Sequence, residues 1–185
     1  MNVLLCLLGL MTVLSGCSGE NRELQAALEF RENLLKAQQC SFSVEITADY
    51  GDSLTEFSME CEGNSSGDLA FAVVKPEEIS GIQGSVSASA GVIRFEEDAV
   101  YFPLMTDDLL TPASAPWIFL KTLRSGCITA ACREDELLHL TLDDSFEEDA
   151  LTVDIWFRED VPIHAEILHK GRRILSLNVG NFAFL

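Results

Sequence analysis

The chain has 185 residues, and its 12 lysines and arginines face 30 aspartates and glutamates, which gives a net charge of −18 at pH 7. A charge of this sign and size repels nucleic acids and anionic lipid headgroups, so neither is expected as an electrostatic partner. The balance allows a basic protein partner or a cationic ligand, although strong acidity is more often a solubility feature.

The first residues have the pattern of a bacterial lipoprotein signal peptide. Residues 3–13 are almost entirely apolar and lead into the lipobox Leu-Ser-Gly-Cys, which ends at Cys17. This run is shorter than the roughly 20 residues of a membrane-spanning helix, but it suits the apolar core of a signal peptide. No lysine or arginine precedes it, which departs from the usual pattern. We expect cleavage between Gly16 and Cys17, and attachment of diacylglycerol to the Cys17 thiol.

Cleavage at this point divides the chain into three parts. Residues 1–16 are the expected signal peptide, residues 17–20 the lipidated cysteine with a short tether, and residues 21–185 a single domain. The two acyl chains of such an anchor, palmitate for example, suffice for stable attachment where one chain would be marginal. The sequence therefore predicts a protein held at the extracytoplasmic face of the cell membrane by its lipid.

The domain begins with a helical pattern, which then gives way to strands. Residues 21–38 are predicted to form a helix whose apolar stripe consists of Leu24, Ala27, Leu28, Leu34 and Leu35. Beyond it, apolar and polar residues alternate in residues 42–50 and again in residues 55–61. Because Gly51 and Asp52 between them are turn residues, these two segments predict a β-hairpin.

The hairpin has a self-consistent register. Folding it at the turn sets Phe57 opposite Ile46 and Met59 opposite Val44, so that the apolar residues of both strands share one face. A shift of one residue would place one of these sets in water. One side of the predicted sheet is therefore apolar and the other polar.

Four cysteines remain besides the lipidated one: Cys40, Cys61, Cys127 and Cys132. Outside the cytoplasm an even number of thiols suggests disulfides. The hairpin makes Cys40 and Cys61 neighbours on the apolar face, so a disulfide between them is favoured in an oxidising compartment. Buried free thiols are the alternative. A zinc site is a weaker one, because no C-x-x-C spacing occurs.

Further strands and one more helical segment follow. Short alternating or apolar runs bounded by turn residues predict strands at residues 69–74, 82–90, 92–96, 100–104, 138–142, 151–158, 161–168 and 175–179. Between them, residues 107–124 have a helical pattern, with Ser114 as a helix cap, Pro116 in the first turn and Gly126 as the stop.

This order of elements predicts a mainly β, α+β fold. About ten antiparallel strands form a curved half-barrel sheet, with an N-terminal helix and an inserted helical plug on the concave face. Two sheets packed as a sandwich would also give strands with one apolar side. The helices favour the half-barrel, because a sandwich offers an amphipathic helix no obvious place to dock.

The layout resembles the LolA/LolB-like superfamily of lipoprotein carriers over nearly the whole mature chain. The segment VVKPEEISGI at residues 73–82 is similar to a strand-proline-turn-strand passage of such lipoproteins, and LTPASAP at residues 110–116 to the entry of their plug helix. The chain looks most like clostridial lipid-anchored members such as the germination lipoprotein GerS, a partner of a cortex-modifying amidase. The resemblance implies a half-open barrel, an apolar ligand and a role in the cell envelope, sporulation or germination. Because the carrier LolA itself is not lipidated, Cys17 favours an anchored acceptor or a partner-binding scaffold.

No motif indicates an enzyme, a metal or a cofactor. On a regular strand His164 and Glu166 face one way and His169 the other, so they cannot converge on a metal, and with His139 they are interpreted as surface histidines. The acidic residues 143–149 lack the glycine and spacing of a calcium-binding loop and are interpreted as a hairpin loop. No G-x-S-x-G motif is present.

The apolar side of the sheet is the most informative surface. With the helix residue it consists of Phe42, Ile46, Phe57, Phe71, Trp117, Leu140, Ile155, Phe157 and Ile163. Burying each large side chain contributes about 1.5–3 kcal/mol, so this face must be covered. One hypothesis is that helices cover it entirely and it is core; the other is an incompletely filled concavity that binds a lipid or acyl chain. A scaffold that binds or activates an envelope or spore-cortex enzyme through exposed edge strands is the competing function.

Overall fold

The computed structural model of the chain describes residues 20–95, 98–106, 109–147 and 149–185. The predicted cleavage and lipidation site, Gly16 and Cys17, lies outside these residues. The described chain begins within the predicted tether, at Glu20.

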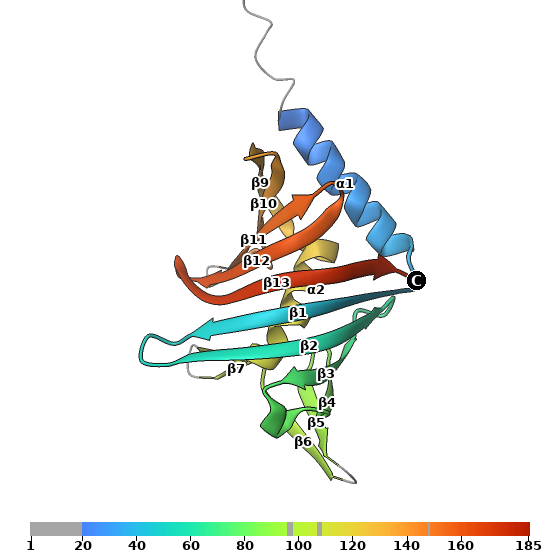
Figure 1. Cartoon of the computed structure of the whole chain (residues 1–185). Coiled ribbons are helices and arrows are strands. Elements are labelled where there is room, and N and C mark those ends of the chain that lie inside the picture. Colours follow the sequence, from blue (N-terminus) through green and yellow to red (C-terminus); the bar gives the residue numbers. More distant parts are fainter. Residues whose placement is uncertain (1–19, 96–97, 107–108, 148) are drawn as a thin grey trace, which may run out of the picture.

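One antiparallel sheet of eleven strands curves around two helices (Figure 1). The order across this sheet is β6-β5-β4-β3-β2-β1-β13-β12-β11-β10-β9, so the C-terminal strand lies beside β1 in the middle. The strands are β1 (Gln39–Asp49), β2 (Leu54–Asn64), β3 (Leu69–Lys75), β4 (Gln83–Val86), β5 (Gly91–Phe95), β6 (Asp98–Phe102), β9 (Cys127–Glu134), β10 (Leu137–Asp143), β11 (Leu151–Arg158), β12 (Val161–His169) and β13 (Arg172–Phe184). The predicted half-barrel fold class is confirmed, and the sandwich is wrong.

The hairpin of β1 and β2 has the predicted register. Ile46 pairs with Phe57 and Val44 with Met59. Buried and exposed residues alternate along β1, and the apolar set points to the concave side. Because β13 pairs with the other side of β1, this hairpin forms the centre of the sheet.

Helix α1 (Glu20–Lys36) covers the part of the concave face formed by the C-terminal strands. Phe30 packs edge-on against Phe157 of β11, with the ring centroids 5.0 Å apart. The side of α1 that faces the sheet consists of Ala27, Phe30 and Leu34. The predicted apolar stripe is therefore only partly right: three of its leucines are exposed, namely Leu24, Leu28 and Leu35.

Helix α2 (Ala115–Ser125) begins later than the predicted helical segment. The residues before it form β7 (Met105–Thr106), β8 (Leu109–Leu110) and a 3₁₀ turn (Pro112–Ser114). Ser114 precedes the helix as predicted, but its hydroxyl donates to the carbonyl oxygens of Thr111 and Leu104, and its oxygen accepts no capping hydrogen bond from the backbone N–H groups of the first turn. Neither α1 nor α2 has the length and apolar character that spanning a bilayer requires.

Strand β9 is a difference from the sequence analysis, which predicts no strand there. It pairs with β10 through a register shift near Thr141. As an outer strand of the sheet it is exposed along most of its length, so it lacks the alternation that marks the inner strands.

A second register shift changes which residues of β12 face inward. The pairing of β11 and β12 shifts between Trp156 and Phe157. As a result Pro162 and Ala165 are buried, whereas Ile163, predicted to face inward, is only half-buried. A bulge of this kind inserts a residue and breaks the strict alternation on which the prediction rests.

Candidate functional site

Helix α2 fills most of the concave face. Its Phe119 packs edge-on against Phe42 of β1, with the ring centroids 5.7 Å apart. Trp117 Nε1 donates a hydrogen bond of 2.9 Å to the carbonyl oxygen of Gly67. The residues of the predicted ligand face that are buried are Phe42, Ile46, Phe71, Trp117, Leu140, Ile155 and Phe157. These residues are core, and the other two, Phe57 and Ile163, are half-buried.

The concave face continues past α2 onto strands β4–β6. Phe71 of β3 pairs with Gly84 of β4, Gly84 with Ile93 of β5, and Ile93 with Val100 of β6. Directly paired residues point to the same side, so these four share one face of the sheet. Ile93 is half-buried, but Val100 is 61% exposed and Phe95 is 60% exposed.

We call four residues of this face the open apolar end: Ile93, Phe95, Val100 and Phe102. Phe102 pairs with Gly91 and its ring lies over that glycine, at a place where any Cβ atom would collide with it. Phe71 lies over Gly84 in the same way. Because these two glycines lack a Cβ atom, the Phe71 and Phe102 rings can lie directly against the concave side of the backbone there.

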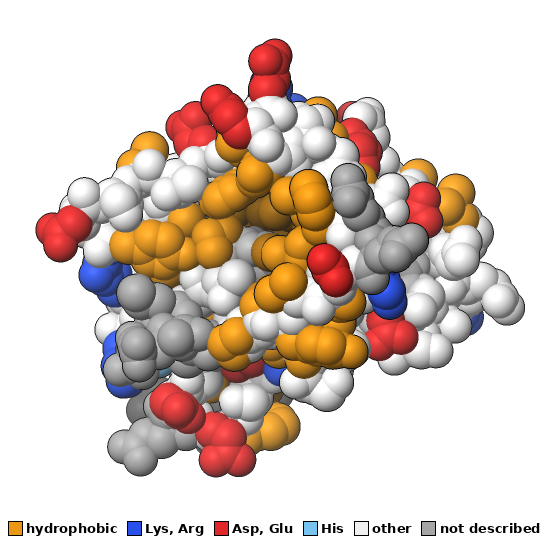
Figure 2. Space-filling view, turned by 90° about the horizontal axis from the view of Figure 1, so that it is seen from below, with side chains coloured by type: hydrophobic (Ala, Val, Ile, Leu, Met, Phe, Trp, Pro, Cys, Tyr) orange, Lys and Arg blue, Asp and Glu red, His pale blue; other side chains and the backbone are white. Residues whose placement is uncertain are grey.

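A hollow is visible at this part of the molecule. Seen from the end at which β4–β6 lie in Figure 1, hydrophobic side chains surround a depression in the surface, and charged side chains lie mainly at its margins (Figure 2). Apolar side chains around an open hollow are the usual lining of a site for an apolar ligand.

The segment that leads into α2 is held against the sheet by Tyr50. The Tyr50 hydroxyl donates a hydrogen bond of 2.7 Å to the carbonyl oxygen of Leu110. Tyr50 directly follows β1, and Leu110 is the last residue of β8, before α2. Partial burial raises the pKa of Tyr50 above its ordinary value, so the hydroxyl keeps its proton for this bond. One phenol therefore joins the end of β1 to the β7–β8 segment.

The convex face of the central strands has the opposite character. Glu45, Glu60 and Lys75 line a hollow there, together with serine and asparagine side chains. This lining mixes its three charged side chains with polar residues and four apolar ones, and the charged groups do not suit an acyl chain. The concave side is therefore the better candidate for an apolar ligand.

Cys40 and Cys61 are buried free thiols, so the predicted disulfide is not formed in the structure. The register explains this, because Cys40 pairs with Gly63 and Cys61 with Phe42. The two cysteines are diagonal neighbours, and diagonal positions lie farther apart than the direct pairs that disulfides favour. Burial raises the pKa of both thiols.

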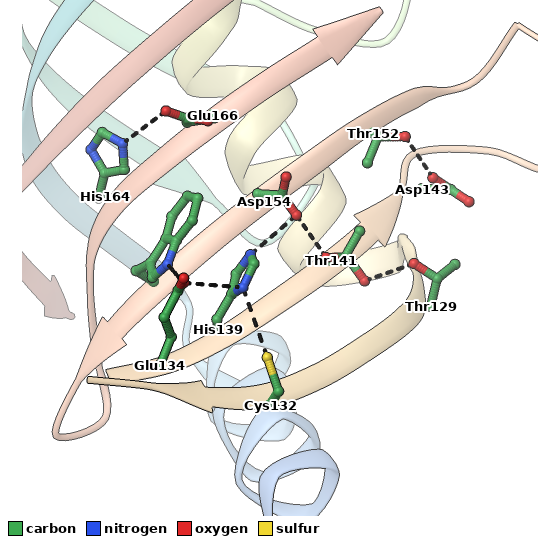
Figure 3. Close-up of polar contacts among 11 residues, drawn as sticks. Thr129, Cys132, Glu134, His139, Thr141, Asp143, Thr152, Asp154, His164 and Glu166 are labelled. Carbon is green, nitrogen blue, oxygen red and sulfur yellow. Dashed lines mark hydrogen bonds and ion pairs between the residues drawn. The ribbon is translucent and has the colours of Figure 1, made fainter. Parts of the chain in front are cut away.

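Two of the three histidines differ from the prediction. His164 and Glu166 share a face as predicted, with Nε2 and Oε1 3.7 Å apart. His169, however, is buried rather than on the surface. His139, interpreted as an isolated surface residue, lies in a polar network on the convex face of β9–β12 (Figure 3).

This network joins residues from neighbouring strands. His139 pairs with Cys132 of β9 on one side and with Trp156 of β11 on the other. The His139 and Trp156 rings stack in parallel, 4.3 Å apart. Sequence reasoning missed it because β9 itself was missed; with that strand in place, the cross-strand register would have brought these side chains together.

The acidic loop after β10 has a structural role. Asp144 accepts a hydrogen bond from the backbone N–H of Leu151 and pairs with Lys121 of α2 at 3.0 Å. It thus links the loop to the plug helix. Within the part of the chain that the structure describes, no group of three or more histidine, cysteine or acidic residues is arranged to hold a metal ion.

No protein-family model and no curated protein matches the sequence. Similar solved structures include a LolA superfamily protein from Nitrosomonas europaea, with a TM-score of 0.48, 8% identity and coverage of 86% of this chain and 93% of that one. A conserved protein from Thermus thermophilus has a TM-score of 0.47 and 13% identity, with 88% and 87% covered.

A chain in the structure of the CwlD amidase from Clostridioides difficile in complex with the GerS lipoprotein has a TM-score of 0.42 and 13% identity, with 88% and 96% covered. The GerS complex is not more similar than the other two, so the particular likeness to clostridial members stays a prediction. At such identities these neighbours assign neither a ligand nor a partner to this chain.

Proposed function

We propose that this chain is a non-enzymatic, lipid-anchored protein of the extracytoplasmic membrane face that binds a lipid or acyl chain at the open apolar end of its concave side. The observation that carries the proposal is the exposure of Phe95 and Val100 on the same face that α2 covers elsewhere. Leaving such side chains in water forgoes about 1.5–3 kcal/mol each. A bound acyl chain would cover them.

The anchor and the site lie at opposite ends of the domain (Figure 1). Helix α1 begins at Glu20, three residues after Cys17, so a lipid on that cysteine would hold the domain close to the bilayer. The open apolar end on β5 and β6 lies at the other end of the domain from the start of α1 (Figure 1), so the anchor itself would not bring the site to the bilayer. The strong negative charge leaves the lipid as the means of attachment.

Strand β6 offers a matched pair of positions for the test. Val100 faces the concave side, and its neighbour Tyr101 pairs with Val92 on the convex side and is 74% exposed. We expect Val100→Asp to weaken binding of a fluorescent fatty acid at least tenfold, because a carboxylate would have to be buried against the ligand. Tyr101→Asp places the same charge on the same strand and should leave binding unchanged.

The binding experiment uses residues 20–185 purified without detergent, and mass spectrometry of an organic extract identifies any lipid already bound. Equal affinities of the two variants, or a protein that carries no lipid and binds no fatty acid, would contradict the proposal.

A protein-binding scaffold is the second candidate, and β6 is the observation that favours it. This outer strand is exposed from Asp98 to Tyr101 and has no neighbour on one side within the described sheet. An unpaired edge can accept a strand from another protein. If the scaffold candidate is right, one stoichiometric partner is recovered with the wild type from membranes, and substituting proline for Ala99 should abolish that recovery. The fatty-acid binding experiment tests the lipid-binding candidate separately.

A further inference from the structure

A thiol, an imidazole and a carboxylate follow one another on the convex face, opposite to the proposed lipid site (Figure 3). Cys132 Sγ lies 3.9 Å from His139 Nδ1, and His139 Nε2 lies 3.2 Å from Asp154 Oδ1. They come from β9, β10 and β11, three adjacent strands of the sheet. Cys132 is exposed, so a reagent can reach its sulfur atom from solvent.

The hydrogen bonds assign the single proton of the neutral His139 ring to Nε2. An ionised Asp154 can only accept, so His139 Nε2 must donate to it. Thr141 Oγ1 donates to the same carboxylate oxygen at 2.7 Å, which fixes its position. In the neutral ring this leaves Nδ1 as an acceptor, directed at the Cys132 thiol. The arrangement is that of a base that can take the thiol proton while its other nitrogen is held.

Two further side chains fix the ring. Trp156 stacks on His139 with only 5° between the ring planes, so the imidazole cannot tilt out of the line from thiol to carboxylate. The same indole donates a 2.8 Å hydrogen bond to Glu134, whose carboxylate lies 3.5 Å from His139 Nδ1. Carboxylates thus lie beside both nitrogens of the ring, Asp154 at Nε2 and Glu134 at Nδ1.

We propose that Cys132 is a site of covalent modification by small neutral or cationic disulfides, with His139 as the base and Asp154 as its positioning residue. His139 Nδ1 takes the proton of the thiol, and the thiolate attacks one sulfur of the disulfide R–S–S–R. The Cys132–S–S–R bond forms as the S–S bond of the reagent breaks. The leaving thiolate R–S⁻ takes the proton from His139, so the exchange needs no other oxidant.

The charge of the surroundings selects the reagent. Glu134 and Asp154 flank the reacting atoms, and the whole chain carries a charge of −18. An anionic disulfide is repelled from this surface, whereas a cationic one is attracted to it. The two buried thiols are closed to any reagent in the folded protein, and half-buried Cys127 lies at the other end of β9.

The test measures the rate at which each cysteine reacts in the full chain, held in detergent micelles. Cystamine is the cationic disulfide, hydroxyethyl disulfide the neutral one and oxidised glutathione the anionic one, with peptide mapping by mass spectrometry as the readout. At neutral pH we expect Cys132 to react at least tenfold faster than Cys127. Cystamine should react at least tenfold faster than oxidised glutathione, and Glu134→Gln should reduce that ratio.

The pH profile separates activation from structure. His139→Gln should slow modification of Cys132 about tenfold at neutral pH, and the variant should match the wild type in strongly alkaline solution, where an ordinary thiol ionises without a base. Asp154→Asn should likewise slow modification of Cys132 at neutral pH and match the wild type in strongly alkaline solution. Cys40 and Cys61 must stay unmodified throughout, which shows that each variant is folded. A neutral-pH rate at Cys132 that is the same with and without His139, or no preference for the cationic reagent, would overturn the proposal.

Discussion

Arg31 is the residue that fastens the two helices to each other. From α1 its guanidinium donates hydrogen bonds of 2.8 Å to the carbonyl oxygens of Leu123 and Gly126, at the C-terminal end of α2. These carbonyls have no partner within their own helix, and a cation is favourable there. Arg31→Met should therefore lower the free energy of unfolding by about 1–3 kcal/mol. Urea unfolding measures this, and Arg22→Met, an exposed substitution on the same helix, is the control that should change little.

The buried thiols predict a loss of stability in alkaline solution. The folded-state pKa of Cys61 is raised by burial, so the folded chain keeps a proton that the unfolded chain loses above a pKa of about 8.5. The contribution is complete below that pH, and it falls with rising pH by up to about 1.4 kcal/mol per pH unit for each thiol. Unfolding under reducing conditions from pH 8 to 10 should show a steeper decline in the wild type than in Cys61→Ala. Cys132→Ala, which removes an exposed thiol, is the control. If the stability of Cys61→Ala fell with pH as steeply as that of Cys132→Ala, this assignment would be contradicted.

Strand β4 depends on a glycine at its centre. A Cβ atom on Gly84 would collide with the Phe71 ring and with the backbone oxygen of Val92. Because a backbone atom cannot move aside cheaply, Gly84→Val should lower the free energy of unfolding by about 1–3 kcal/mol. It should also weaken fatty-acid binding, since β5 and β6 attach to the sheet through β4. Ser85→Val, the next residue on the opposite face, is the control. Normal binding by Gly84→Val would show that the lipid does not contact this end of the sheet.

Strands that are buried on one face and exposed on the other were predictable from the sequence. Strands exposed on both faces, and the point at which α2 begins, were not. The β1–β2 hairpin follows from strict alternation and one turn, because a slip of one residue would expose Phe57 and Met59 together. In β9 both faces are largely exposed, so the local sequence contains no periodic signal. The start of α2 was predicted too early because Leu109 and Leu110, which fit the helical pattern of the segment that follows, form β8 instead. The candidate site was predicted only in outline for the same reason: which part of the concave face α2 leaves open depends on where that helix begins.

The two sides of the sheet separate two kinds of chemistry. The concave side holds the apolar core and ends in an exposed apolar surface, whereas Glu45, Glu60 and the Cys132 network lie on the convex side. A lipid on one side and a modified thiol on the other would not compete for the same atoms. They could still be coupled, because His139 on the convex side is adjacent in β10 to buried Leu138 and Leu140 on the other. Fatty-acid affinity measured before and after cystamine treatment would detect such coupling.

Attachment to the membrane is the property on which the proposed function rests. The chain has two cysteines before residue 20, and only Cys17 ends a lipobox, whereas Cys6 lies within the apolar run. We expect Cys17→Ser to prevent lipidation, so that mass spectrometry no longer finds a diacylglycerol-modified N-terminus and the mature domain is not recovered as a lipoprotein. Cys6→Ser should leave both cleavage and lipidation intact. Since a charge of −18 gives no electrostatic attraction to anionic lipid, a Cys17→Ser chain that was still processed and still floated with vesicles would mean that another part of the protein binds the bilayer.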